Sequence, residues 1–205
     1  MRIDRPPPGE ELNTGEVTTA RPASTVIPVR DGNAGLELLL VQRNPAARFM
    51  GGAWVFPGGA VHEGETEVET AVREAEEEAC LALDAATLVP FSRWITPRQV
   101  KVRFDTHFFV APTPPDASPV CDGEECVDLR WIGPAAALDA GEREDLFLVF
   151  PTIKHLEQLA GFGSVEELLA HARSRRVQPV EPRVLVDGGV AQVLLPGETG
   201  YDDAG

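Results

Sequence analysis

The sequence predicts an α+β fold, an α/β/α sandwich in which helices flank a mixed β-sheet. Three features of the 205-residue chain lead to this prediction. Short segments rich in Val, Leu and Phe come first, one strongly periodic helical segment interrupts them, and helical segments dominate the remainder. This order is typical of one mixed sheet with helices packed on its faces. The length and the 43% hydrophobic content suit a single domain.

The expected strands begin with two that flank a turn. Residues 24–30 and 36–43 carry β-branched and aliphatic side chains, and the run Asp-Gly-Asn-Ala-Gly at 31–35 supplies the turn between them. Residues 53–56 are predicted to form a short strand that ends at Pro57 and the two glycines after it. The same reasoning predicts further strands over 87–95, 101–110 and 126–132.

The expected helices are marked by apolar side chains that recur every three or four residues. Residues 64–80 are the clearest case, with an apolar stripe made of Val68, Ala71, Val72, Ala75 and Ala79. Residues 164–175 begin with Ser164 and place Glu167 three positions later, which is a capping box. Two more helices are expected over 134–140 and 149–160, and a hairpin over 183–195 that turns at Asp187, Gly188 and Gly189.

One domain is expected to span residues 19–198, with the C-terminal helices and hairpin of 141–198 included. Residues 1–18 are rich in Pro and Glu and lack periodicity, so we expect a disordered N-terminal tail there. Residues 199–205 resemble them in composition and are expected to form a second disordered tail.

Composition excludes several classes of function. The net charge is −15, from 33 acidic and 18 basic residues, and a field of that sign repels nucleic acid and anionic lipid surfaces. No apolar run reaches the roughly 18–20 residues of a membrane span, and the N-terminus lacks the apolar segment of a secretory signal. Three cysteines without a CxxC motif favour a reducing compartment, so we expect a cytoplasmic protein.

Chemistry concentrates in residues 59–81. Eight of these residues are glutamate, and one, Arg73, carries a positive charge. On a helix, Glu74, Glu77 and Glu78 share one face, where like charges repel. A hard divalent cation such as Mg²⁺ or Mn²⁺ would compensate for this crowding and would attract an anionic substrate. A solvated acidic helix face is the alternative that composition alone leaves open.

The spacing within this segment is more specific than its composition. The order G-x5-E-x7-R-E-x2-E-E is followed by Gly59, Glu65, Arg73, Glu74, Glu77 and Glu78. It resembles the signature of the Nudix hydrolases, and Leu81 also fits that signature. Two positions depart from it. Ala75 stands in place of a bulky aliphatic residue, and Cys80 in place of a glycine at the expected end of the helix.

The resemblance implies the Nudix fold, with its loop–helix–loop, and a metal centre. Three carboxylates would bind Mg²⁺ or Mn²⁺, namely Glu74, Glu77 and Glu78. The carbonyl of Gly59 is a further candidate ligand. Glu65 and Arg73 would pair and support the loop–helix–loop.

The resemblance also implies the reaction class. Nudix enzymes hydrolyse the pyrophosphate of a nucleoside diphosphate linked to another group, so the implied partner is a small-molecule nucleotide. The catalytic base would lie either in the helix, at Glu74 or Glu77, or in a later loop. In that later loop Asp122, Glu124 and Glu125 are the candidates.

A second motif overlaps the first. Residues 39–59 resemble the pattern LLTxR(S/A)x3Rx3Gx3FPGG of the Nudix enzymes that cleave coenzyme A and its acyl thioesters. Val41 and Asn44 depart from that pattern. Coenzyme A carries a 3′-phosphate besides its pyrophosphate, and guanidinium groups bind phosphate in bidentate fashion. The implied substrate-binding residues are Arg43, Arg48 and Gly58.

The expected function is therefore hydrolysis of coenzyme A or acyl-coenzyme A to 3′,5′-ADP and a 4′-phosphopantetheine compound. The first alternative keeps the chemistry and takes ADP-ribose, NADH or a dinucleoside polyphosphate as substrate. The second is a Nudix domain that binds a ligand without catalysis, although this chain retains every signature carboxylate. Because Nudix relatives are often dimers, a homodimer is a further expectation.

Overall fold

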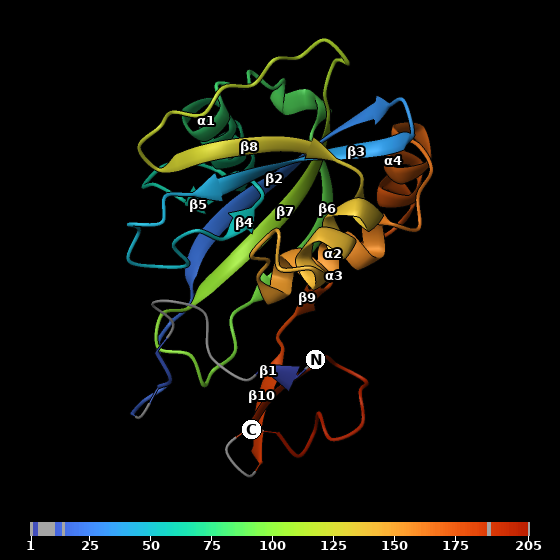
Figure 1. Cartoon of the computed structure of the whole chain (residues 1–205). Coiled ribbons are helices and arrows are strands. Elements are labelled where there is room, and N and C mark those ends of the chain that lie inside the picture. Colours follow the sequence, from blue (N-terminus) through green and yellow to red (C-terminus); the bar gives the residue numbers. More distant parts are fainter. Residues whose placement is uncertain (1, 4–10, 14, 188–189, 205) are drawn as a thin grey trace.

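The computed structural model describes residues 2–3, 11–13, 15–187 and 190–204. Within these residues a mixed sheet of eight strands forms the centre of the molecule (Figure 1). Its strands are β2 (Arg21–Gly32), β3 (Gly35–Arg43), β4 (Trp54–Val55), β5 (Gly58–Ala60), β6 (Val89–Ile95), β7 (Phe104–Pro112), β8 (Cys126–Ile132) and β9 (Pro179–Val180). The helices are α1 (Glu67–Ala79), α2 (Pro134–Glu142), α3 (Phe150–Leu159) and α4 (Val165–Ser174), with a 3₁₀ turn at Ala85–Thr87.

The sheet is mixed because its long strand β2 has both parallel and antiparallel neighbours. β2 runs antiparallel to β3 and β5 and parallel to β7. β3 also pairs with β4 and β8, while β6 pairs with β7 and, in parallel, with β9. The first half of β2 meets β5, which places Gly58 and Gly59 opposite Thr25 and Ser24. The glycine pair is thereby held on the sheet close to the start of α1, where the Ser24 hydroxyl donates to the Glu67 carbonyl at 2.6 Å.

Helices cover both faces of the sheet, which confirms the predicted α/β/α arrangement. The core beneath α1 buries Ala71, Ala75 and Ala79 against Val26, Leu39 and Phe109. The helices α2, α3 and α4 cover the opposite face (Figure 1), with a core that includes Ile27, Leu38, Phe91, Leu156 and Leu168. Adjacent strand residues point to opposite faces, so the central parts of these strands, residues 26–29 of β2 and 38–41 of β3, are continuously apolar because both of their faces are buried.

The predicted elements occur within a few residues of their expected bounds, and the differences have local causes. The first helix begins at Glu67 rather than at residue 64, because Thr66 caps it and exchanges hydrogen bonds with Glu69. The hairpin is present as β10 (Arg183–Asp187) and β11 (Val190–Leu194), while its turn glycines lie outside the described residues. None of the described helices combines the length and apolarity needed to cross a bilayer.

Both segments expected to be disordered tails pair with the rest of the chain in their described parts. β1 (Arg2–Ile3) pairs with β11, and Lys101 donates a backbone hydrogen bond to Glu11 at 2.8 Å. At the other end the Tyr201 hydroxyl donates to the Glu181 carbonyl at 2.8 Å, and Ala204 is buried. These contacts, most of them between backbone groups, involve the described parts of the two segments, and the disorder expected for both segments stays a prediction. The domain boundaries at 19 and 198 stay a prediction.

One polar side chain, His155 of α3, lies inside the core between the sheet and α3. Its ring is 1% exposed and stacks on Phe108 with 4.2 Å between the centroids. The Pro151 carbonyl, 2.6 Å from Nδ1, can only accept, so Nδ1 carries the proton and Nε2 accepts from the Ser92 hydroxyl at 2.6 Å. Both ring nitrogens are thus satisfied in the neutral form. Burial lowers the pKa of His155 to about 4.

Helix α1 ends at a residue in the left-handed conformation. Cys80 has φ 47° and ψ 37°, and its N–H bonds to the carbonyls of Ala75 and Glu76. A Cβ atom is strained in this region of φ and ψ, where glycine is free. The Nudix signature has glycine at this position, and glycine adopts the observed left-handed conformation without strain. Cysteine in the same conformation destabilises the folded protein.

Cys80→Gly is expected to raise the free energy of unfolding by about 0.5–1 kcal/mol, because it relieves this strain. The Cys80 side chain is exposed, so little packing is lost. Urea unfolding measures the difference. Cys80→Ala removes the thiol, keeps the Cβ and should not stabilise the protein. Equal stability of the glycine variant and the wild type would show that the cap is not strained.

Candidate active site

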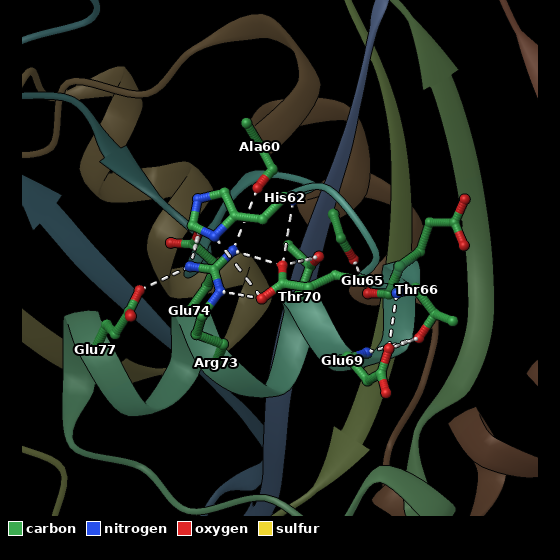
Figure 2. A network of polar contacts seen from close by, with 11 residues as sticks. Ala60, His62, Glu65, Thr66, Glu69, Thr70, Arg73, Glu74 and Glu77 are labelled. Atoms are coloured by element: carbon green, nitrogen blue, oxygen red, sulfur yellow. Dashed lines mark hydrogen bonds and ion pairs between the residues drawn. The ribbon is translucent and has the colours of Figure 1, made fainter.

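The candidate site forms where α1 packs beside β5. The glycines of β5 lie against one side of the helix, and the glutamates of the helix's second half face them or the solvent. Figure 2 shows the polar network that joins α1 to the loop before it, with Arg73 at the centre. The sequence therefore folds an acidic helix onto a glycine backbone that leaves room for its carboxylates.

Arg73 ties α1 to the preceding loop. Its Nε and Nη2 donate to the two oxygens of Glu65 at 2.9 and 3.1 Å, and Nη2 also donates to the Ala60 carbonyl at 3.2 Å. The Thr70 hydroxyl and the His62 N–H donate to the same carboxylate (Figure 2). The hydrogen bonds from Arg73 lower the pKa of Glu65 to about 2. The predicted Glu65–Arg73 pair is thus formed, and it fixes the loop to the helix.

Glu74 lies directly against the backbone of Gly59. A Cβ placed on residue 59 would lie 2.2 Å from Glu74 Oε1, closer than two such atoms can approach. Arg73 Nη1 donates to the same oxygen at 2.8 Å. Burial raises the pKa of Glu74 in spite of Arg73, and the charges of Glu77 and Glu125 add to the rise. The Glu74 carboxylate therefore fits at this place because residue 59 is a glycine and has no Cβ atom.

Glu78 is the most buried of the three signature carboxylates, at 3% exposed. The Gly58 N–H donates to its Oε2 at 3.0 Å. Burial raises the pKa of Glu78 to about 7, with further contributions from the charges of Glu74 and Glu125, while the Gly58 hydrogen bond and Arg43 oppose the rise. An anionic carboxylate is costly in such surroundings, and a nearby divalent cation would remove that cost.

Glu77 does not join this pair of carboxylates directly. Its side chain is 58% exposed and accepts from Arg73 Nη1 at 2.7 Å (Figure 2). The structure thus brings Glu74 and Glu78 together beside β5 and links Glu77 to them through Arg73. Because Glu77 is exposed, its side chain is free to change rotamer once Arg73 is given up.

The loop before β8 approaches the same site. Asp122 accepts from the backbone N–H groups of Glu125 and Cys126, both at 2.8 Å, so it closes the turn. The side chains of Glu124 and Glu125 are exposed. The charge of Glu125 contributes to raising the pKa of both Glu74 and Glu78, which connects this loop electrostatically to the helix.

Asn44 is a residue that sequence reasoning treated only as a departure from a motif. Its backbone N–H donates to the Glu125 carbonyl at 2.7 Å, and its Nδ2 donates to the Glu124 carbonyl at 2.8 Å. It therefore holds the loop before β8 against the end of β3. The dipeptide Asn44-Pro45, a turn signal, is the sequence feature that could have revealed it.

Arg43 and Arg48 lie in different surroundings. Arg43 lines an open cavity of about 290 Å³ together with Asn44, Glu124 and Glu125, and its Nε is buried without a hydrogen-bond partner in the described structure. Arg48 is exposed and does not line this cavity. Lys101 lowers the pKa of Glu11, and the charge of Arg48 adds a smaller contribution to that lowering. The N–H of Gly58 is engaged by Glu78. Of the three predicted substrate-binding residues, Arg43 alone therefore reaches the cavity with an unpartnered group.

The donor set suits a hard divalent cation. Glu74 and Glu78 offer carboxylate oxygens close to the backbone of β5, and oxygen is the ligand type that Mg²⁺ and Mn²⁺ prefer. Over the described ranges no group of three His, Cys, Asp or Glu side chains already forms a complete metal cluster. Completion would require Glu77 to leave Arg73 and turn toward the other two carboxylates.

Gly59→Ala is expected to lower kcat by about 10- to 100-fold, because the new Cβ displaces the Glu74 carboxylate by an ångström or more. Steady-state kinetics with the preferred substrate measures the loss, and thermal unfolding checks that the fold persists. Gly133→Ala is the matched control, since a Cβ there would meet nothing closer than 3.6 Å. Equal activity of both variants would mean that Glu74 does not act from its position beside Gly59.

The chain is similar to a known protein family and to curated proteins. The NUDIX domain family matches residues 19–152. A protein of Mycobacterium tuberculosis strain CDC 1551, named as a candidate 8-oxo-dGTP diphosphatase 3, is 35% identical over 101 residues, which are 48% of this chain and 45% of the relative. The chain thus spans about half the length of the curated relatives it matches.

Two solved structures share the fold. A NUDIX hydrolase from Alicyclobacillus acidocaldarius is 25% identical, with a TM-score of 0.68 over 75% of this chain and 96% of that one. The NUDIX domain of NrtR from Shewanella oneidensis, crystallised with ADP ribose, has a TM-score of 0.55 at 18% identity. That match covers 69% of this chain and 86% of the NrtR domain.

Proposed function

Because this chain belongs to the NUDIX domain family, we propose that it is a metal-dependent hydrolase that cleaves the pyrophosphate of coenzyme A or acyl-coenzyme A. One observation carries the proposal. Two buried carboxylates, Glu74 and Glu78, lie against the glycine backbone of β5, and the charge of Arg43 acts on one of them. Buried carboxylates that lie close together can bind a divalent cation. A cation and an arginine side by side can then bind the phosphate oxygens of a pyrophosphate.

The reaction is a hydrolysis in which water attacks one phosphorus of the pyrophosphate. A bond forms between the water oxygen and that phosphorus, and the bond to the bridging oxygen breaks. The bridging oxygen leaves with the other phosphate, and the water proton passes to a carboxylate. With coenzyme A the products are 3′,5′-ADP and 4′-phosphopantetheine.

Each residue of the site has a proposed task. Glu74, Glu77 and Glu78 would hold Mg²⁺ or Mn²⁺, which supplies charge neutralisation on the phosphates and a more acidic water. Gly58 would orient Glu78 through its N–H. Arg73 would release Glu77 when the cation binds and keep Glu65, so the loop stays attached to the helix.

The proton acceptor is one of four glutamates: Glu74, Glu77, Glu124 or Glu125. Glu125 is favoured over Glu124 because its charge acts on both buried carboxylates of the helix. A carboxylate that lines the cavity and whose charge acts on the proposed metal ligands is a candidate to take a proton from water held there.

The preference for coenzyme A rests on the resemblance of residues 39–59 and on the position of Arg43. Its buried Nε has no partner in the part of the chain that the structure describes, and a phosphate oxygen would satisfy it. Arg48 is proposed to meet the 3′-phosphate when substrate binds, since it is exposed and free of a hydrogen bond to any described residue.

A substrate panel tests the proposal. Coenzyme A, acetyl-coenzyme A, ADP-ribose, NADH, diadenosine tetraphosphate and 8-oxo-dGTP are incubated with the protein, with Mg²⁺, with Mn²⁺ and with EDTA. Mass spectrometry should show 3′,5′-ADP from the first two with metal and intact substrate with EDTA. Intact coenzyme A at high enzyme concentration would refute the substrate assignment, and inertness toward every compound would favour a ligand-binding domain without catalysis.

The other compounds in the panel represent the second candidate function. The curated relative's name points to 8-oxo-dGTP, and the NrtR domain was crystallised with ADP ribose. Both compounds present a pyrophosphate or triphosphate to the same carboxylates. Faster cleavage of either one than of coenzyme A would assign the chain to that substrate. We also propose a reducing, cytoplasmic setting, because Cys80, Cys121 and Cys126 are free thiols.

A further inference from the structure

A groove of about 500 Å³ lies at the outer edge of the sheet, away from the candidate active site. It runs along β6 and β7 and is closed by the last turn of α4 and the residues after it. Apolar side chains contribute to its walls, among them Val89, Phe108 and Val177. β9 pairs with β6 only at Arg93 and Trp94, so the earlier part of that β6 edge has no neighbouring strand among the described residues.

The polar lining of this groove is basic. Arg93, Arg173, Arg175 and Arg176 contribute to its walls, and no Asp or Glu does. The chain as a whole has 33 acidic and only 18 basic residues, so a wall with four arginines and no carboxylate departs from the rest of the molecule. A fixed positive patch in an acidic protein is a local attractor for anions.

Two of these arginines make hydrogen bonds to other described residues of the protein, and two do not. Arg93 makes a bidentate pair with Asp105 at 2.8 and 2.6 Å, and Arg175 donates to the Phe91 carbonyl at 3.3 Å. Arg173 and Arg176 are exposed, and neither makes an ion pair or hydrogen bond with any described residue. Arg175 therefore shapes the groove, while Arg173 and Arg176 have their donors available to a ligand.

The groove is separate from the metal centre. The strand register places Gly58 opposite Thr25, Thr25 beside Phe108, and Phe108 opposite Ser92. Two steps between strands separate the glycine backbone from Phe108, which lines the groove, a distance of about 10 Å. In addition, α4 and α1 pack on opposite faces of the sheet. A molecule in the groove would therefore occupy a second site and would not need the carboxylates of α1.

We propose that this groove binds a phosphorylated small molecule, with Arg173 and Arg176 on the phosphate and the apolar wall on the remainder. The planar guanidinium fork matches phosphate oxygens in bidentate fashion. A volume of about 500 Å³ with mixed apolar and polar walls is that of a small-molecule site rather than of a bare ion. The inference is independent of the hydrolase activity proposed above.

Calorimetric titration with AMP in excess EDTA tests the proposal. EDTA removes any metal from the carboxylates of α1, so those carboxylates repel the nucleotide. The test variant is Arg173→Gln/Arg176→Gln. The control is Arg21→Gln/Arg143→Gln, which removes the same charge from two exposed arginines elsewhere. Adenosine and inorganic phosphate separate the contributions of the base and of the anion.

We expect saturable binding of AMP that the test variant weakens at least about 10-fold and the control variant leaves unchanged. Inorganic phosphate should compete, and adenosine should bind more weakly than AMP. Absence of AMP binding to the wild type would overturn the proposal. So would equal affinity of the two variants, or adenosine binding as tightly as AMP. Hydrolysis by the test variant reports separately on the proposed function.

Discussion

Glu78→Gln is expected to lower kcat at least about 100-fold, equivalent to roughly 2.7 kcal/mol of transition-state stabilisation. Glu78 is buried, and its Oε2 accepts from the Gly58 N–H. Glutamine keeps the size of the side chain, and its amide oxygen can keep that hydrogen bond. What it removes is the negative charge that would hold a divalent cation beside β5. The expected loss therefore measures metal binding rather than folding.

The matched control is Glu76→Gln, which removes one charge from an exposed position of the same helix. Its kcat should stay within about twofold of wild type. Magnesium titration by calorimetry should show weaker uptake by Glu78→Gln and normal uptake by Glu76→Gln. If Glu78→Gln turned over substrate at the wild-type rate, Glu78 would have no part in catalysis and its burial would be structural.

Much of this site follows from the sequence because it rests on local spacing. Glu74 and Glu78 are one helical turn apart, so any helix over 64–80 brings them onto one face. The Glu65–Arg73 pair follows from the Nudix resemblance. The orientation of Glu77 does not, because it depends on Arg73, which bonds Glu65, Glu74 and Glu77 at the same time. No spacing rule predicts how one guanidinium is shared.

Two predictions differ from the structure because they depend on backbone pairing and on backbone conformation. The sequence predicts that a strand ends at Gly58 and Gly59, yet these glycines pair with Thr25 and Ser24 as part of β5. Glycine has low strand propensity, so only the position of β2 could reveal that pairing. The separation of Arg48 from Arg43 likewise arises in the 44–52 loop, whose path depends on Met50 and Gly52 at positive φ.

Two buried groups are expected to give the stability of this protein opposite dependences on pH. The pKa of Glu78 rises from its ordinary 4.5 to about 7, so the folded state takes up a proton first as the pH falls, and stability is gained. The pKa of His155 falls from 6.5 to about 4, so the unfolded state takes up the proton first and stability is lost. Between pH 7 and pH 5 each effect amounts to about 2 kcal/mol, with opposite signs.

Urea unfolding in EDTA at pH 7 and pH 5 separates the two groups. Relative to wild type, His155→Gln should become more stable by about 2 kcal/mol on going to pH 5, because the variant has no imidazole to protonate. Glu78→Gln should become less stable than wild type by about the same amount, because it has lost the carboxylate that gains a proton.

The remaining titrating groups are common to all three proteins and largely cancel in these differences. Glu74, whose pKa is also raised, is the exception, because the charges of Glu74 and Glu78 repel each other. Its shift would shrink in Glu78→Gln, which makes that variant fall further at pH 5 and leaves the sign unchanged. Parallel pH profiles for wild type and His155→Gln would instead mean that the imidazole already reaches solvent. Its neutral bridge between Pro151 and Ser92 would then not persist in solution.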